Sequence, residues 1–181
     1  MNPFAFLVDI LFYLYTLVLM LRLLLQWVKA DFYNPASQFI VKVTNPVVIP
    51  LRRIIPGYGG IDFATLVLVL AFTALKLTLV LMVSGAPLGS LSPVGLILQT
   101  LLDTIDLVLN IFLFAIIVQA ILSWVNPDPY HPMIGLLNSL TWPVLKPFRR
   151  LLPPLGGFDI SPIFAIIVIM FIKQSIHYFL L

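Results

Sequence analysis

The stretch PLRRIIPGYGGID at residues 50–62 recurs as PFRRLLPPLGGFD at residues 147–159, at an offset of 97 positions. At this offset residues 25–62 align with residues 122–159 without a gap, and 16 of the 38 positions are identical. Asp9 and Lys76 likewise match Asp106 and Lys173. The sequence therefore predicts two copies of one unit, with domains at residues 1–84 and 94–181 and a connecting loop at residues 85–93.

The composition and the apolar runs place both copies in a membrane. Hydrophobic residues make up 61% of the chain and charged residues 9%, whereas soluble domains contain roughly 25% charged residues. Four apolar runs each approach or exceed the ~20 residues that a helix needs to cross ~30 Å of hydrocarbon: 2–28, 63–83, 94–125 and 160–181. The first run lacks the basic start and the cleavage pattern of a signal peptide. We expect an all-α membrane protein with four transmembrane helices.

Each unit contains two spans, so both copies enter the membrane in the same direction and form parallel helix-linker-helix repeats. The basic residues near the spans gather in the two linkers, while residues 84–93 carry no charge; these basic residues are Lys29, Lys42, Arg52, Arg53, Lys146, Arg149 and Arg150. The positive-inside rule therefore predicts cytoplasmic linkers and two termini on the opposite, outer side.

Within the first linker, residues 36–43 have the spacing of a short amphipathic helix that lies on the membrane interface. We expect Pro46 to end this helix, and the glycines at 59 and 60 to reverse the chain with positive φ angles. Asp62, and Asp159 in the second copy, then stand where the N-cap of the next span belongs.

The arginine pairs of the repeated phrase, Arg52 with Arg53 and Arg149 with Arg150, have two interpretations. They can anchor the linker to anionic headgroups, or they can bind one specific lipid or protein partner, since guanidinium groups suit phosphate. Membrane lipids and other membrane proteins are thus the expected partners, and a homo-oligomer is left open. No nucleotide-binding pattern is present, and nucleic acid is not an expected partner.

Charged residues also occur inside the spans, where they are costly and indicate a function by default. Helical rise puts Asp9 ~27 Å and Lys76 ~21 Å from the cytoplasmic interface. We therefore expect the pairs Asp9 with Lys76 and Asp106 with Lys173, although a crossed pair of Asp9 with Lys173 fits the same depths. Such pairs can fix helix register, form a proton or ion relay, or contact another membrane protein.

Two further span residues have no charged counterpart at the repeat offset. Arg22, which corresponds to Gln119, is expected to extend toward the interface near Trp27. Asp103 is expected near the outer end of the third span.

The sequence does not favour an enzyme. There is no cysteine, which excludes thiolate chemistry and disulfides. His131 and His177 are predicted on opposite sides of the membrane, which disfavours a bis-histidine haem. No metal-ligand spacing or catalytic triad is apparent, and we expect neither a cofactor nor catalytic residues.

The repeated pattern resembles the YggT family, also called YlmG, in its two-copy form. The matching residues are Trp27, Pro50, Arg52, Arg53, Pro56, Gly59, Gly60 and Asp62, with Trp124, Pro147, Arg149, Arg150, Pro153, Gly156, Gly157 and Asp159. The resemblance implies a bacterial inner-membrane protein, and links it to osmotic and envelope stress and to assembly in the membrane. A scaffold or assembly factor is the first hypothesis, and a component of an ion channel or transporter is the alternative.

Overall fold

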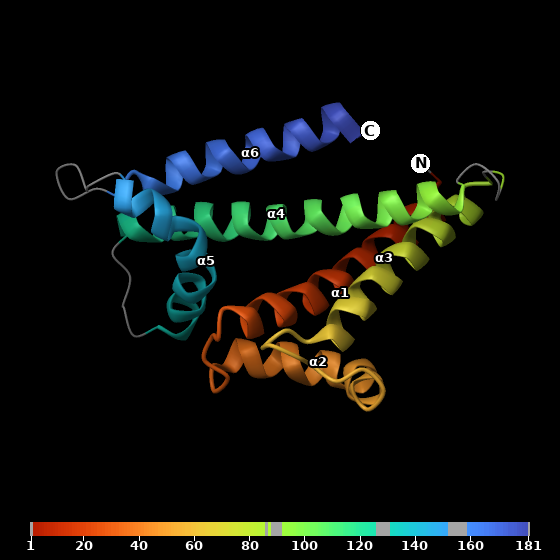
Figure 1. Cartoon of the computed structure of the whole chain (residues 1–181), viewed down its shortest axis with the longest axis horizontal. Helices are drawn as coiled ribbons and strands as arrows, with labels where there is room; N and C mark the ends of the chain where they lie inside the picture. The colour runs from red at the N-terminus through yellow and green to blue at the C-terminus, as the bar shows by residue number, and fades with distance from the viewer. Residues whose placement is uncertain (1, 86, 88–91, 126–130, 152–158, 181) are drawn as a thin grey trace. The chain divides into compact units, whose positions relative to one another are not determined.

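The computed structural model describes residues 2–85, 87, 92–125, 131–151 and 159–180 (Figure 1). Six α-helices account for the regular structure in these ranges: α1 (Pro3–Trp27), α2 (Pro35–Arg52), α3 (Phe63–Val83), α4 (Pro93–Val125), α5 (Pro132–Leu151) and α6 (Ser161–Leu180). Four of them, α1, α3, α4 and α6, are long and apolar enough to cross a membrane. The predicted all-α membrane fold is confirmed.

The chain divides by its internal contacts into two compact units, each described below by itself. The first unit comprises Met1–Leu23 and Ile40–Leu107, and the second comprises Leu24–Phe39 and Val108–Leu181. These units are defined by spatial contact, whereas the repeats are defined by sequence, so the domain boundaries at residues 84 and 94 stay predictions.

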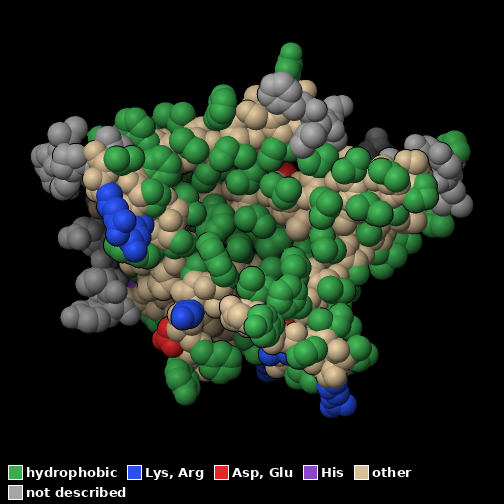
Figure 2. Space-filling model, viewed as in Figure 1, with side chains coloured by type: hydrophobic (Ala, Val, Ile, Leu, Met, Phe, Trp, Pro, Cys, Tyr) green, Lys and Arg blue, Asp and Glu red, His purple; other side chains and the backbone are tan. Residues whose placement is uncertain are grey.

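Aromatic side chains hold α1 against α3 in the first unit. The ring of Phe72 lies 6.0 Å from that of Phe12 and 5.0 Å from that of Tyr15, between centroids. Leu19 on α1 and Val69 on α3, each within a few residues of these rings along the chain, are fully buried. Many large apolar side chains are exposed instead, and hydrophobic side chains are spread widely over the visible face in Figure 2. Exposed apolar surface of this extent suits contact with lipid rather than water.

The linker helices are longer than the sequence predicts. Helix α2 continues through Pro46 and Pro50 to Arg52, and α5 continues through Pro143 and Pro147. The prediction that Pro46 ends the helix is wrong. A proline removes only its own N–H and the bond to the carbonyl four residues earlier, and buried packing at Thr44 and Val48 holds α2 on both sides of Pro46.

After α2 the chain reverses as the glycine pair predicts. Gly59 and Gly60 have φ angles of 64° and 85°, in the left-handed region that glycine adopts without a steric penalty. The backbones of Tyr58 and Ile61 exchange hydrogen bonds of 3.2 and 3.1 Å across the turn. The corresponding positions Pro153, Gly156 and Gly157, and most of residues 85–93, lie outside the described residues.

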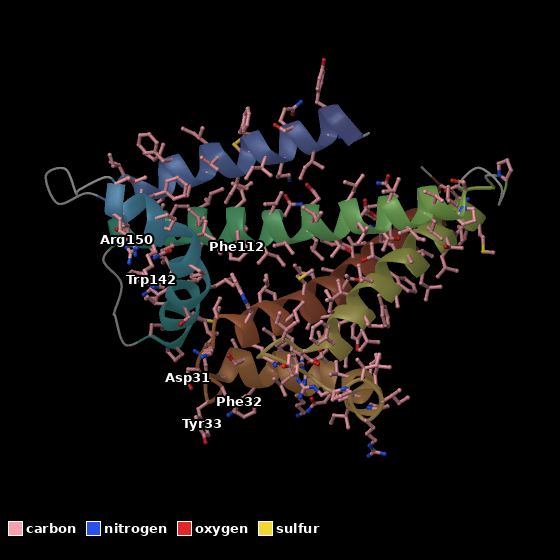
Figure 3. All side chains as sticks on the ribbon, in the orientation of Figure 1. Asp31, Phe32, Tyr33, Phe112, Trp142 and Arg150 are labelled. Atoms are coloured by element: carbon pink, nitrogen blue, oxygen red, sulfur yellow. The ribbon has the colours of Figure 1, made fainter. Side chains whose placement is uncertain are left out.

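Both linker helices begin with a side-chain cap at the same repeat position. The Asn34 Oδ1 accepts a 3.0 Å hydrogen bond from the amide of Ala36, and His131 Nδ1 accepts one of 3.3 Å from Met133. In the second unit Asn34 Nδ2 also donates a hydrogen bond of 2.7 Å to the carbonyl oxygen of Pro132. His131 therefore has a structural role at the start of α5. The turn just before Asn34 exposes the rings of Phe32 and Tyr33 (Figure 3).

Candidate functional site

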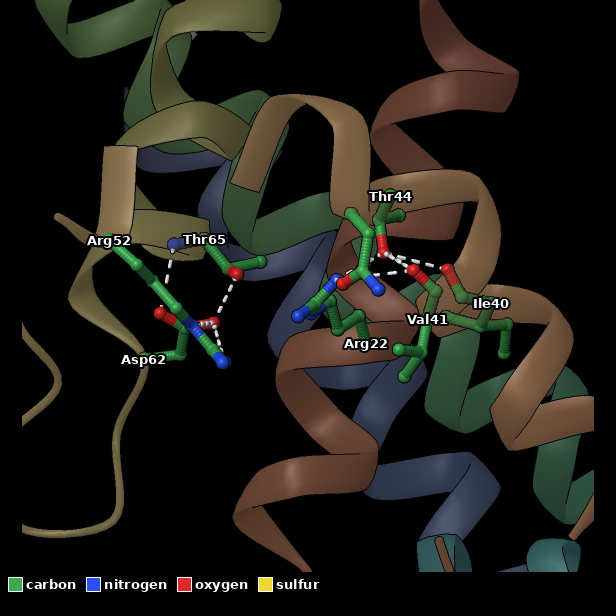
Figure 4. A network of polar contacts seen from close by, with 8 residues as sticks. Arg22, Ile40, Val41, Thr44, Arg52, Asp62 and Thr65 are labelled. Atoms are coloured by element: carbon green, nitrogen blue, oxygen red, sulfur yellow. Dashed lines mark hydrogen bonds and ion pairs between the residues drawn. The ribbon is translucent and has the colours of Figure 1, made fainter. Parts of the chain in front are cut away.

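The first repeated phrase closes on itself through an ion pair at the start of α3 (Figure 4). Arg52 Nη2 and Nε donate to Asp62 Oδ2 over 2.6 and 3.1 Å. Asp62 also caps α3, since its Oδ1 accepts a 3.3 Å hydrogen bond from the amide of Thr65, whose hydroxyl donates to Oδ2. The arginine that the sequence offers as a partner site thus also fixes the end of its own linker.

The carboxyl group of Asp62 is almost fully buried, with 1% of its side chain exposed. Burial alone would raise its pKa, but the hydrogen bonds from Arg52 and Thr65 and the charge of Arg52 outweigh burial and hold the pKa below its usual range. Asp62 is therefore ionised at neutral pH, which lets it pair with Arg52 and with the positive end of the α3 dipole.

The second phrase repeats this contact in a looser form. Arg149 Nε donates 2.8 Å to Asp159 Oδ2, and 32% of each side chain is exposed. Pro162 stands at the repeat position of Thr65 and has neither an amide hydrogen nor a hydroxyl to offer; Asp159 Oδ1 accepts instead from the amide of Ser161. Burial alone would raise the pKa of Asp159. The hydrogen bonds from Ser161, and the hydrogen bond and charge of Arg149, outweigh burial and hold this pKa below its usual value.

The side chain of Arg22 reaches the linker helix α2 and is buried against it, and its predicted extension toward the interface near Trp27 stays a prediction. Only 7% of Arg22 is exposed. Its Nη1 donates 2.6 Å to the hydroxyl of Thr44 and 2.9 Å to Asn45 Oδ1, and lies 3.5 Å from the carbonyl of Val41. Neutral oxygen atoms of the linker helix thus satisfy a cation that water would otherwise solvate.

The second copy makes the corresponding contact with a neutral side chain. Gln119, at the position of Arg22, accepts a hydrogen bond from the hydroxyl of Thr141 and donates 2.9 Å to Asn138 Oδ1. Thr44 and Thr141 are one of the identical pairs of the repeat. That identity is the sequence signal that could have revealed the link between each first span and its linker helix.

Lys76 on α3 contacts two carboxylates in the spans of the first unit. Its Nζ lies 3.7 Å from Asp9 Oδ1 and 3.2 Å from Asp103 Oδ2. Gln99 Nε2 also donates 2.9 Å to Asp103 Oδ1. The structure therefore brings Asp9 and Lys76 together and adds Asp103, which sequence reasoning left without a partner. In the second unit Lys173 donates to Asn110 Oδ1. Asp106 precedes Asn110 by one turn of α4 and falls in the first unit, and its pair with Lys173 stays a prediction.

The other basic residues of the linkers face outward. Lys42, Arg53, Lys146 and Arg150 are exposed, together with apolar neighbours such as Phe39, Ile54 and Trp142. The guanidinium of Arg149 lies 5.7 Å from the centre of the Trp142 ring, and Figure 3 shows Trp142 and Arg150 on α5. Cations beside exposed aromatic rings are typical of surfaces at the headgroup layer.

A pocket of about 260 Å³ lies in the second unit beside the Arg149–Asp159 pair. Its apolar lining includes Leu122, Ile134 and Ile163, and its polar lining residues are Gln119, Ser123, Asn138, Arg149 and Asp159. Among the described residues there is no group of three His, Cys, Asp or Glu side chains that could hold a metal ion. His177 is exposed in the last turn of α6.

Comparison with known proteins gives consistent relatives. The sequence pattern of the CCB3/YggT family matches residues 1–83 and 98–180. The chain is 47% identical to "Uncharacterized protein PA0392" of Pseudomonas aeruginosa, over 90% of this chain and 82% of that protein. It is 40% identical to "Uncharacterized protein YggT" of Escherichia coli K12, over 97% of this chain and 90% of that protein. "YlmG homolog protein 2, chloroplastic" of Arabidopsis thaliana is 39% identical over 34% of this chain and 24% of its own. No solved structure matches the chain.

Proposed function

The chain belongs to the CCB3/YggT family, and from this premise we propose that it is a non-enzymatic scaffold or assembly factor of the bacterial inner membrane. The observation that carries the proposal is that each linker exposes cations together with aromatic rings. Phe39 and Lys42 are exposed on α2 and Arg53 directly after it, while Trp142, Lys146 and Arg150 are exposed on α5. Such linkers suit anionic headgroups and neighbouring membrane proteins on the cytoplasmic side, with both termini in the periplasm.

The buried charges support a structural rather than a catalytic use. Lys76 has carboxylates within ion-pair distance, and Arg22 has three oxygen acceptors. Charges satisfied within the chain hold helices in register, while the exposed cations remain available to partners.

Complementation of a deletion strain under osmotic stress tests the scaffold function. The double variant Arg53→Gln with Arg150→Gln removes exposed charge and spares the ion pairs of Arg52 and Arg149. We expect this variant to reach the membrane in normal amounts and to fail in restoring growth after an osmotic upshift. Full restoration by the double variant would contradict the proposal.

An ion-conducting role is the second candidate, because 41% of the Asp9 side chain is exposed beside Lys76 within the spans. Purified protein in liposomes under an osmotic gradient separates the two functions. A scaffold gives no ion flux above protein-free vesicles. Flux that Asp9→Asn abolishes would favour the channel.

A further inference from the structure

We propose that the pocket of the second unit binds the phosphodiester headgroup of a membrane phospholipid. Its lining comes from α4, α5 and the start of α6, at the linker end of the spans. The bound lipid would be one component of the assemblies that the proposed scaffold organises, so its biological role rests on that function.

Arg149 supplies the donors for a phosphate. Its Nε bonds Asp159, whereas neither Nη1 nor Nη2 bonds any residue in the described part of the chain. In the first unit, by contrast, Arg52 uses both Nε and Nη2 on Asp62. Trp142 lies under the Arg149 guanidinium and limits its orientation. A guanidinium whose two amino groups have no bond to the described residues suits bidentate contact with phosphate oxygens.

The remainder of the lining fits the part of a phospholipid next to the phosphate. Asn138 and Ser123 offer polar groups for the glycerol esters, and Leu122, Ile134 and Ile163 offer apolar contact for the first acyl carbons. The volume of about 260 Å³ lies near the lower end of the ~300–1,000 Å³ typical of small-molecule sites. It accommodates a headgroup and glycerol, and leaves the acyl chains in the bilayer.

The first unit explains why we assign the site to the second unit alone. Gln119 and Asn138 of the pocket correspond to Arg22 and Val41, and the buried Arg22 guanidinium lies beside Val41 and within electrostatic range of Arg52 and Asp62. A larger cationic side chain thus stands where the second unit has Gln119. Asp62 is also 1% exposed, against 32% for Asp159. Among the described residues, Arg22 and the nearly buried Asp62 of the first copy thus stand where the second copy has Gln119 and the more exposed Asp159.

Native mass spectrometry of the delipidated full chain, titrated with dioleoylphosphatidylglycerol, tests the site. We expect Arg149→Gln to weaken binding of the first lipid by about tenfold, as for loss of a hydrogen-bonded charge. Lys29→Gln removes one exposed charge of the second unit that lies outside the pocket, and should change binding by less than about twofold. Equal losses in these two variants would overturn the proposal. Arg149→Lys keeps the positive charge but lacks the planar guanidinium group. If this variant binds the lipid as tightly as the unmodified protein, the proposal is also overturned.

Gln119→Arg separates a shaped site from simple attraction to charge. The arginine is compatible with the fold because Arg22 occupies this position in the first copy, and it should fill the pocket and reduce lipid binding although it adds a positive charge. Tighter binding by Gln119→Arg would assign the interaction to net charge and overturn the proposal. Displacement of the lipid by an equal concentration of inorganic phosphate would assign the site to free phosphate instead.

The purified protein also separates this site from the scaffold function. If the protein binds the lipid normally and its Arg53→Gln, Arg150→Gln variant still restores growth of the deletion strain, the scaffold function is rejected and the site is retained. Complementation that depends on Arg53 and Arg150, with no specific lipid bound, would reject the site and retain the function.

Discussion

Arg22 donates a 2.6 Å hydrogen bond to the hydroxyl of Thr44, and 97 positions later Gln119 accepts one from the hydroxyl of Thr141. Each contact joins the last turns of a first span to the middle of its linker helix. The threonine is identical in the two copies, while its partner is a cation in one and a neutral amide in the other. The link itself is therefore the shared feature, and the charge is specific to the first unit.

Arg22→Leu is expected to lower the free energy of unfolding by about 2 kcal/mol, as for loss of a hydrogen bond to a charged group with its acceptors left buried. Arg22→Gln should lose less, because Gln119 makes the equivalent contact in the second unit. Unfolding in mixed SDS micelles, followed by circular dichroism, measures both. If the Gln variant is as unstable as the Leu variant, the contact with Thr44 does not stabilise the linker.

Acid should destabilise the protein through Asp62. Its pKa is lowered in the folded state, whereas an unfolded Asp titrates near ~3.9. Stabilisation from the ionised carboxylate is therefore full above about pH 4 and is lost as the pH falls toward the folded-state pKa. Asp62→Asn should lower stability at neutral pH and flatten its decline in acid. A wild-type pH profile in this variant would show that Asp62 does not contribute. The more exposed Asp159, changed to Asn, should give a smaller effect in the same direction.

The carboxylate partners of Lys76 can be ranked by double-mutant cycles. Asp103 Oδ2 is closer to the Lys76 Nζ than Asp9 Oδ1 is, at 3.2 against 3.7 Å, and its side chain is less exposed, at 25% against 41%. We expect the coupling free energy of Lys76→Ala with Asp103→Ala to exceed that with Asp9→Ala, within the ~0.5–3 kcal/mol typical of contacting residues. Strictly additive effects in both cycles would mean that neither ion pair stabilises the fold.

Two glycines should respond to alanine with opposite signs. Gly60 has a φ of 85°, so Gly60→Ala should lower the unfolding free energy by about 1–2 kcal/mol. Gly135 lies within α5 with no heavy atom within 4 Å of an added Cβ, so Gly135→Ala should raise it by about 0.5–1 kcal/mol. The same denaturation assay checks both. A neutral Gly60→Ala would mean that the turn relaxes to another conformation.

Several features were accessible from local sequence. The four spans follow from the length of the apolar runs, and the glycine reversal follows from a residue type with one dominant conformational use. The N-terminal position of Asp62 on α3 also required only the order of residues around it. Pro46 shows the limit of this reasoning, because packing of Thr44 and Val48 preserves a helix that the local rule would end.

Other contacts depended on which distant residues meet. The depths in the membrane that helical rise predicts from the sequence were enough to pair Asp9 with Lys76. They gave no reason to add Asp103, since that residue has no counterpart in the repeat. Arg22 was expected near the interface because its long side chain can reach there, but the sequence did not indicate that Thr44 and Asn45 on α2 accept its hydrogen bonds in a buried position. The looser state of Asp159 similarly follows from Pro162, which cannot donate where Thr65 does.

The sequence by itself determined the membrane-spanning class of this protein and its duplicated plan, because hydrophobic length and repeat identity are properties of the chain alone. Only the tertiary structure decided which charges are satisfied internally and which side chains line the pocket of the second unit. Those outcomes depend on distances between residues far apart in the chain, and a single exchange such as Arg22 for Gln119 changes the space between helices without changing the pattern that builds them.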